Sequence, residues 1–170
     1  MKLFVLDVES VGLWGPPFAV GWAILAGQDI VACEYVWCDP RRAPGPWCQP
    51  PDEDAWAWIE ANVLPKLSIH RQMSYSDMLA CFSEEWAERK AEGFLLAADV
   101  PFPVETNFLV PALPEHRRPY PLLDVASMVM ALTGEWDEND QDEKNKHNPM
   151  HDAVYSAERL LRALKTGARA

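Results

Sequence analysis

Two acidic residues stand two positions apart directly after the first apolar segment of the chain. Asp7 and Glu9 follow residues 3–6 (LFVL), a run typical of a buried β-strand. Because alternate residues of a strand point to the same face, the two carboxylates are expected side by side. Like charges this close repel each other, and Mg²⁺ or Mn²⁺, which prefer oxygen ligands, would relieve the repulsion. The spacing therefore indicates a divalent-metal site, with two solvated carboxylates at a strand end as the alternative.

A second group of ionisable residues lies near the C-terminus, in the segment HNPMHD that begins at His147. Asn148 is a suitable N-cap and Pro149 suits the first helical position, so a helix is predicted to begin here. Asp152 then falls within the first turn or so of this helix. Asp can ligate a metal, while His, which titrates near neutral pH, can act as a general base. His151 competes with His147 for that role, but its place next to Asp152 on a helix is expected to point it elsewhere.

In order and spacing these two segments resemble the signature of the DEDDh 3′–5′ exonucleases. This family is the DnaQ-like branch of the ribonuclease H-like fold and includes RNase T, oligoribonuclease and proofreading subunits. The segment DVESVGL at residues 7–13 is similar to its first motif, including the Gly-Leu pair, and HNPMHDA is similar to its third motif, with the family's five-residue step from His to Asp. The resemblance spans nearly the whole chain. It implies that Asp7, Glu9 and Asp152 are metal ligands and that His147 is the general base.

The middle motif departs from the family pattern. The family usually shows an Asn, then Phe-Asp, then an apolar pair after its fourth strand, whereas this chain has ADVPFPVETNFL at residues 98–109. Asp99, at a predicted strand end, is the first choice for the fourth metal ligand. Glu105 is a rival or accessory acid, because it precedes an apolar pair with the family's spacing.

The resemblance also implies a reaction and a substrate. Two Mg²⁺ or Mn²⁺ ions about 4 Å apart would clamp the scissile phosphate, and His147 would take a proton from the attacking water. The substrate would be the 3′ end of single-stranded RNA or DNA, with neither favoured, and the products would be nucleoside 5′-monophosphates. Leu13 or Trp14 would wedge against or stack on the last base. The expected substrate-binding residues are Ser10, Gly12, Leu13, Trp14 and Lys146.

Two other functions stay open on the sequence. One is a nuclease-like module that binds nucleic acid or protein without cutting, as a regulatory or viral counter-defence factor; the clustered ionisable groups argue against it. The other is a ribonuclease H-like endonuclease, against which His147 argues. Because many relatives are homodimers, a homodimer is also a candidate, with an interface at Trp56 and Trp58.

Composition and charge exclude several classes of protein. Of the 170 residues, 49% are hydrophobic, which excludes global disorder, and the length suits a single domain over residues 1–170. The net charge of −11, from 26 Asp+Glu against 15 Lys+Arg, excludes a simple basic-patch binder of nucleic acid. It does not exclude an enzyme that meets phosphates through metal ions. No signal-peptide pattern and no membrane-length apolar run is found in the sequence, so a cytoplasmic protein without a membrane partner is expected.

The apolar pattern predicts the elements that would position these residues. Three strands come first, the second and third joined by the turn 27–29 as an antiparallel hairpin. Further strands alternating with helices follow. This order predicts an α/β fold with a mixed sheet flanked by helices, as in the ribonuclease H-like architecture, and Asp124 is interpreted as a helix cap. The predicted strands cover residues 3–6, 18–25, 30–37, 94–98 and 122–123, and the predicted helices cover residues 52–64, 76–92, 104–110, 124–132 and 149–165.

Overall fold

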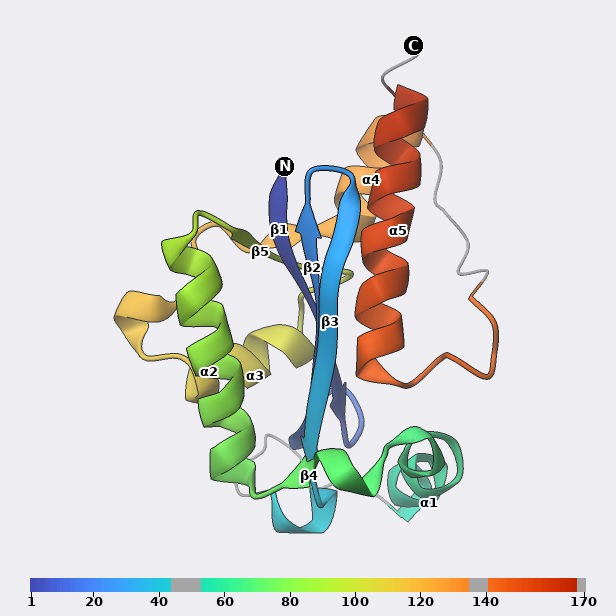
Figure 1. Cartoon of the computed structure of the whole chain (residues 1–170). Helices are drawn as coiled ribbons and strands as arrows, with labels where there is room; N and C mark the ends of the chain where they lie inside the picture. The colour runs from blue at the N-terminus through green and yellow to red at the C-terminus, as the bar shows by residue number, and fades with distance from the viewer. Residues whose placement is uncertain (44–52, 135–140, 168–170) are drawn as a thin grey trace.

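A six-stranded sheet forms the centre of the computed structural model, which describes residues 1–43, 53–134 and 141–167 (Figure 1). The strands are β1 (Lys2–Ser10), β2 (Pro17–Ala26), β3 (Asp29–Cys38), β4 (Gln72–Met73), β5 (Leu95–Ala98) and β6 (Leu123–Asp124). The strand order is β4-β3-β2-β1-β5-β6. β1, β2 and β3 form an antiparallel meander, whereas β5 and β6 continue the sheet parallel to β1. The mixed sheet with three antiparallel N-terminal strands is as predicted.

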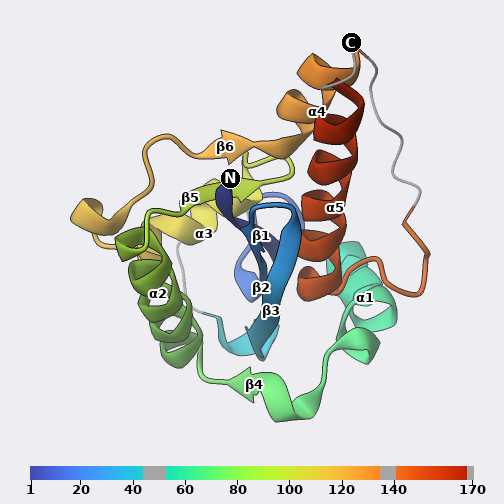
Figure 2. The ribbon, with the colours of Figure 1, turned by 45° about the horizontal axis from the view of Figure 1, so that its top comes forward.

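Helices flank both faces of this sheet. They are α1 (Glu53–Asn62), α2 (Tyr75–Ala91), α3 (Val104–Ala112), α4 (Val125–Thr133) and α5 (Pro149–Gly167). α2 and α3 pack on one face and α4 and α5 on the other, as Figure 2 shows. α1 lies beside the N-terminal end of α5 in both views. Across the described ranges, no helix combines the length and the apolar character needed to span a membrane.

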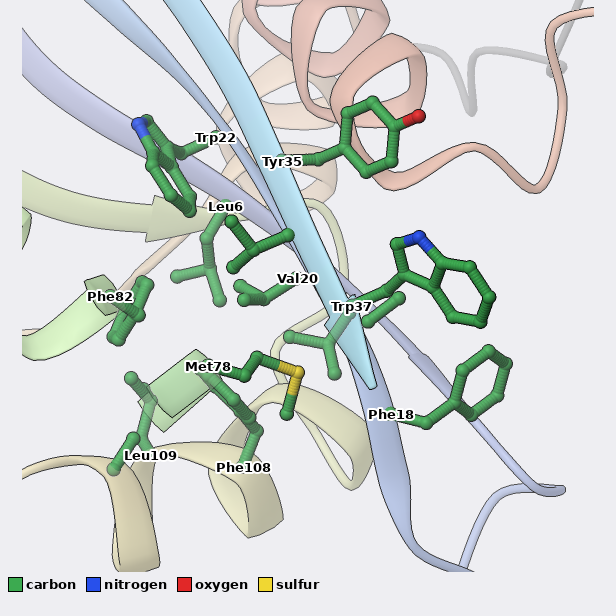
Figure 3. Close-up of a cluster of buried hydrophobic side chains, with 14 of the residues drawn as sticks. Leu6, Phe18, Val20, Trp22, Tyr35, Trp37, Met78, Phe82, Phe108 and Leu109 are labelled. Atoms are coloured by element: carbon green, nitrogen blue, oxygen red, sulfur yellow. The ribbon is translucent and has the colours of Figure 1, made fainter. Parts of the chain in front are cut away.

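The side chains of β1 alternate between two hydrophobic cores. Leu6 and Val8 belong to the core beneath α2 and α3, which is rich in aromatic rings such as Phe82 (Figure 3). Leu3 and Val5 belong to the opposite core, beneath α4 and α5. The two acidic residues of the first motif continue this second series, because side chains two apart share a face. They are therefore directed towards α5.

Local signals in the sequence explain some element boundaries and miss others. Asp124 caps α4 as expected, accepting a hydrogen bond of 2.8 Å from the backbone N–H of Ser127. β1 continues beyond its predicted end at Leu6, because β2 pairs with it as far as Ser10. β4 was not predicted, since two residues are too few to show a strand pattern. Pro65, directly after the helix predicted over residues 52–64, lies within a short 3₁₀ turn at Leu64–Lys66 that follows α1.

The first turn of α5 packs directly on the backbone of β2 at Gly21. Gly21 pairs with Asp7 across the sheet. A Cβ atom on Gly21 would lie 2.2 Å from the carbonyl carbon of Pro149 and 2.3 Å from the backbone nitrogen of Met150. The missing side chain therefore lets the start of α5 approach the part of the sheet that carries the acidic motif.

Gly21→Ala is expected to destabilise the protein by about 1–3 kcal/mol, the usual range for overpacking. It is also expected to weaken Mn²⁺ binding, because the first turn of α5 must move away from β1. Denaturant unfolding and calorimetric titration with Mn²⁺ measure the two effects. An alanine variant with the wild-type unfolding midpoint and Mn²⁺ affinity would contradict this role for Gly21.

Candidate metal centre

Three carboxylates from two elements meet at one point beside the sheet. Asp7 and Glu9 extend from β1, and Asp152 extends from the first turn of α5. One oxygen atom from each side chain lies within 4.8 Å of the other two. The first and third motifs of the sequence are thus brought together, although Asp152 follows Glu9 by 143 positions.

The electrostatics of this group favour protonated carboxyls unless a cation is present. Burial raises the pKa of Asp7 well above its usual range, and the charges of Asp152 and Glu9 raise it further. Burial, followed by the charge of Asp152, raises the pKa of Glu9 to about 8. Burial also raises the pKa of Asp152 to about 6. A divalent cation would supply the positive charge that these three groups require in order to ionise together.

Asp152 carries a second indication of a ligand. Its Oδ2 atom accepts a hydrogen bond of 2.9 Å from the backbone N–H of His147. Its Oδ1 atom is buried and meets no hydrogen-bond donor among the described residues. Leaving a buried carboxylate oxygen without a partner costs free energy. Since Mg²⁺ and Mn²⁺ bind carboxylate oxygens, the donor set formed with Asp7 and Glu9 fits such an ion.

His147 is held at the edge of this group by the start of α5. Its backbone is in the left-handed region, with φ at 62°, which is uncommon for residues other than glycine. Asn148 caps the helix as predicted, because its Oδ1 atom accepts hydrogen bonds from the N–H groups of Met150 (3.2 Å) and His151 (3.4 Å). His147, Asp152 and neighbouring side chains line a cavity of about 160 Å³.

The His147 imidazole is biased towards its neutral form. Burial lowers its pKa, and the positive charges of Lys66 and Lys146 lower it further, although Glu143 opposes them. A neutral imidazole near pH 7 can accept a proton. The ring of Trp58 on α1 lies edge-to-face against it, with 4.7 Å between ring centroids. Trp58 therefore restricts the positions that this ring can take.

Lys66 joins the segment after α1 to the loop that carries His147. Its Nζ atom donates hydrogen bonds to the backbone carbonyls of Lys146 (2.6 Å) and Glu143 (3.1 Å). In return, Asn148 Nδ2 donates to the carbonyl of Lys66 at 3.0 Å. The ammonium group of Lys146, an expected substrate contact, forms an ion pair with Glu143.

The two candidates for the middle acidic position have different surroundings. Both carboxylate oxygens of Asp99, directly after β5, accept hydrogen bonds from Nη1 of Arg159 at 3.0 and 3.1 Å. The Arg159 side chain is only 5% exposed. Glu105, in the first turn of α3, is 7% exposed, and burial raises its pKa to about 7. In the described part of the chain, the close group of three carboxylates includes neither of them.

The expected substrate-binding residues after Glu9 form a tight turn. The Ser10 hydroxyl donates a hydrogen bond of 2.7 Å to the carbonyl of Gly12. Gly12 has φ at 69°, a value that favours glycine. The turn leaves the next two side chains in solvent, with Leu13 64% and Trp14 41% exposed. These residues are thus accessible at the end of the strand that carries Asp7 and Glu9.

Sequence reasoning missed three side chains that shape the site, namely Arg159, Trp58 and Lys66. Arg159 could have been found, because it follows Asp152 by seven residues on one helix and so shares its face. Trp58 and Lys66 come from the segment before α2, and no spacing in the sequence links them to the His147 loop.

Comparisons with known proteins identify the fold. No family model matches the chain, and no curated protein sequence matches it. Among solved structures, the chain is similar to Exonuclease X in complex with 5′ overhanging duplex DNA, with 12% sequence identity and a TM-score of 0.55. The likeness covers 96% of this chain and 92% of that chain. It confirms the predicted ribonuclease H-like α/β fold.

Proposed function

We propose that the chain is a metal-dependent 3′–5′ exonuclease acting on single-stranded RNA or DNA, with nucleoside 5′-monophosphates as products. The observation that carries the proposal is the convergence of Asp7, Glu9 and Asp152 beside a half-buried histidine, His147. The likeness of the fold to an exonuclease solved with DNA supports a nucleic-acid substrate. The order of the first and third motifs supports the 3′–5′ direction.

Each residue of the centre has a distinct part in this proposal. Asp7, Glu9 and Asp152 hold two divalent ions, which when bound polarise the scissile phosphate and lower the pKa of a water molecule. His147 accepts the proton of the attacking water, because its lowered pKa leaves the imidazole neutral. Asp152 also fixes the backbone of His147 through its Oδ2 atom. Trp58 limits the rotation of the imidazole from the solvent side.

For the fourth carboxylate, the surroundings favour Glu105 over Asp99. Asp99 already has a cationic partner, since Arg159 donates to both of its oxygens. Both acids lie within electrostatic reach of the centre, because the charge of Glu105 raises the pKa of Asp7 and Glu9 and the charge of Asp99 raises the pKa of Asp7 and Asp152. Asp99 also lines the cavity beside the centre, so the ion pair with Arg159 is what separates the buried Glu105 from it. We therefore assign Glu105 as the fourth metal ligand. The Asp99–Arg159 ion pair would instead position α5 against the end of β5.

This assignment predicts different effects for two amide substitutions. Glu105→Gln is expected to weaken Mn²⁺ binding by about 10-fold or more, because a metal-ligating charge is lost. Asp99→Asn is expected to lower the free energy of unfolding by about 3 kcal/mol, because it removes the charge of the carboxylate that forms an ion pair with the buried Arg159 guanidinium. Calorimetric titration with Mn²⁺ and denaturant unfolding compare the two variants. Weaker Mn²⁺ binding in Asp99→Asn and a lower free energy of unfolding in Glu105→Gln would instead indicate that Asp99 is the metal ligand.

Digestion of 5′-labelled single-stranded RNA and DNA in parallel, with Mn²⁺ and with EDTA, tests the function. A ladder that shortens from the 3′ end and requires Mn²⁺ is expected. His147→Ala is expected to abolish it, whereas His151→Ala, on the exposed side of α5, serves as the matched control. Internal cuts from the first time point would instead favour the endonuclease.

The remaining alternatives have tests of their own. Absence of both hydrolysis and Mn²⁺ binding in the wild-type protein would favour a binding or regulatory module. A homodimer with an interface at Trp56 and Trp58 stays a prediction, and light scattering in solution tests it. Because Trp58 is exposed and contacts His147, such an interface would lie close to the metal centre.

A further inference from the structure

Lys66 contacts the chain on both sides of His147. Before the histidine, its Nζ atom donates hydrogen bonds to the carbonyls of Glu143 (3.1 Å) and Lys146 (2.6 Å). After the histidine, the carbonyl of Lys66 accepts a hydrogen bond of 3.0 Å from Nδ2 of Asn148. One residue from a distant part of the chain therefore holds the loop of the expected general base at two points.

Lys66 is itself anchored in the hydrophobic core. Its N–H donates a hydrogen bond of 2.9 Å to the carbonyl of Val63, within the turn that follows α1. Val63 and Leu67, on either side of this turn, are buried in the core beneath α2 and α3. The Lys66 side chain thus extends from a fixed point of the core to the loop before α5.

The backbone of His147 requires support from its surroundings. Its φ of 62° lies in the left-handed region, which is uncommon for residues other than glycine. Such a conformation persists only where neighbouring structure enforces it. Asp152 Oδ2 accepts a hydrogen bond from the His147 N–H on the side of the helix. The contacts of Lys66 support the histidine from the side of the preceding loop.

The carbonyl contacts are the interactions that Lys66 makes with its charged group. Among the described residues it forms no ion pair, so its replacement leaves no carboxylate without a partner. Trp58, on α1, restricts the ring of His147, whereas Lys66 restricts the backbone. The segment from α1 to Lys66, which lies beside the start of α5 in Figure 2, therefore supports the site although it contributes no ligand to the close group of three carboxylates.

We propose that Lys66 is a positioning residue, which holds the backbone of His147 so that the imidazole faces the water that attacks at the metal centre. The inference rests on the proposed exonuclease function, because that function makes His147 the general base. Lys66 acts through His147 and touches neither the substrate nor the metal. Proton transfer requires hydrogen-bond distance, so a small displacement of the imidazole costs much of its contribution.

The first test compares two substitutions of Lys66 in the digestion of 5′-labelled single-stranded RNA and DNA with Mn²⁺. Lys66→Met removes the donor, and its kcat is expected to fall about 10–100-fold with KM unchanged. Mn²⁺ binding should persist, because β1 and the first turn of α5 hold the three carboxylates. Lys66→Arg can donate to both carbonyls and should recover most of the lost turnover.

Lys90→Met is the matched control. Lys90 also donates to two backbone carbonyls, those of His116 (3.3 Å) and Arg118 (3.4 Å), but it belongs to α2 on the other face of the sheet. This variant removes the same charge from the chain, and its kcat and KM should equal those of the wild type.

A second measurement does not depend on activity. The chain has four histidines, so protein labelled with ¹⁵N-histidine gives four backbone amide signals, and the signal missing from His147→Ala belongs to His147. In Lys66→Met this signal should shift and the amide should exchange faster with solvent, because its hydrogen bond to Asp152 opens more often. An unchanged His116 signal shows that the variant is folded. In Lys90→Met the His147 signal should stay in place.

Two kinetic results would overturn the inference. One is a wild-type kcat in Lys66→Met. The other is a raised KM with kcat unchanged, which would mean that the ammonium group binds the substrate. An unchanged His147 signal in Lys66→Met would overturn the inference as well. If the signal responds as expected but the wild-type protein hydrolyses neither RNA nor DNA, Lys66 holds His147 and the exonuclease proposal fails.

Discussion

Asp7→Asn is expected to lower kcat at least about 10³-fold while leaving the chain folded. The neutral amide cannot provide the anionic oxygen that a divalent ion requires, and several kcal/mol of transition-state stabilisation correspond to such a factor. In EDTA at pH 8 the same substitution should raise the melting temperature, because on folding the wild-type carboxyl must either take up a proton or bury its charge, and the amide does neither. Loss of activity combined with gain of metal-free stability distinguishes a ligand from a residue that only supports the fold.

The matched control is Asp29→Asn, at the exposed start of β3. This variant removes the same charge from the chain without touching the carboxylate cluster, so its turnover and melting temperature should equal those of the wild type. If turnover of Asp7→Asn were within tenfold of the wild type, Asp7 would not be required for the reaction. A lower melting temperature of Asp7→Asn in EDTA would show that its carboxylate is stabilising in the folded state.

The parts of the site that follow periodic rules could be predicted from the sequence. Alternation along β1 places Asp7 and Glu9 on one face, and the cap at Asn148 places Asp152 in the first turn of α5. Both rules act over a few residues. Their convergence required only that the two elements be neighbours, which the resemblance to the DEDDh exonucleases implied.

The parts that depend on tertiary packing could not be predicted in this way. Asp99 and Glu105 are equally acidic in the sequence, and only the structure shows that Asp99 pairs with the buried guanidinium of Arg159. In the sequence, Gly21 is an ordinary residue of an apolar strand, and only the structure shows that the backbone of α5 packs against it. Trp58 and His147 are in contact although they are far apart in the sequence, so no sequence spacing predicts this contact.

The acidity of the chain also has a clearer meaning in the structure. Part of the net charge of −11 belongs to the carboxylates of the centre, whose raised pKa values show that their charges are unfavourable without a cation. Two divalent ions would add four positive charges at that point. Binding of a polyanion is therefore expected to depend on metal. Stacking of bases, rather than a basic surface, is expected to supply the rest of the affinity.

The metal-free protein is expected to become less stable as the pH rises from about 5 to about 8.5. Burial raises the pKa of Glu9 to about 8, of Glu105 to about 7 and of Asp152 to about 6. In this range the folded chain holds protons that the unfolded chain has already released, and stability falls with pH wherever the folded state binds more protons. Because one unit of pKa shift is worth about 1.4 kcal/mol, a loss of at least several kcal/mol is expected, which corresponds to a fall in Tm of more than about 10 °C for a chain of this size. Thermal unfolding of EDTA-treated protein across the pH range measures it.

Mn²⁺ should reverse this dependence, because ions bind the deprotonated carboxylates and stabilise only the folded chain. The rise in Tm on adding Mn²⁺ is therefore expected to be small at pH 5 and largest at pH 8.5. Glu9→Gln should flatten the metal-free slope, because it removes a titrating group of the centre, whereas Glu88→Gln, on the exposed side of α2, should leave the slope unchanged. A metal-free stability that stays level or increases up to pH 8.5 would mean that these carboxylates ionise without cost, and the case for a divalent ion between them would lose its electrostatic basis.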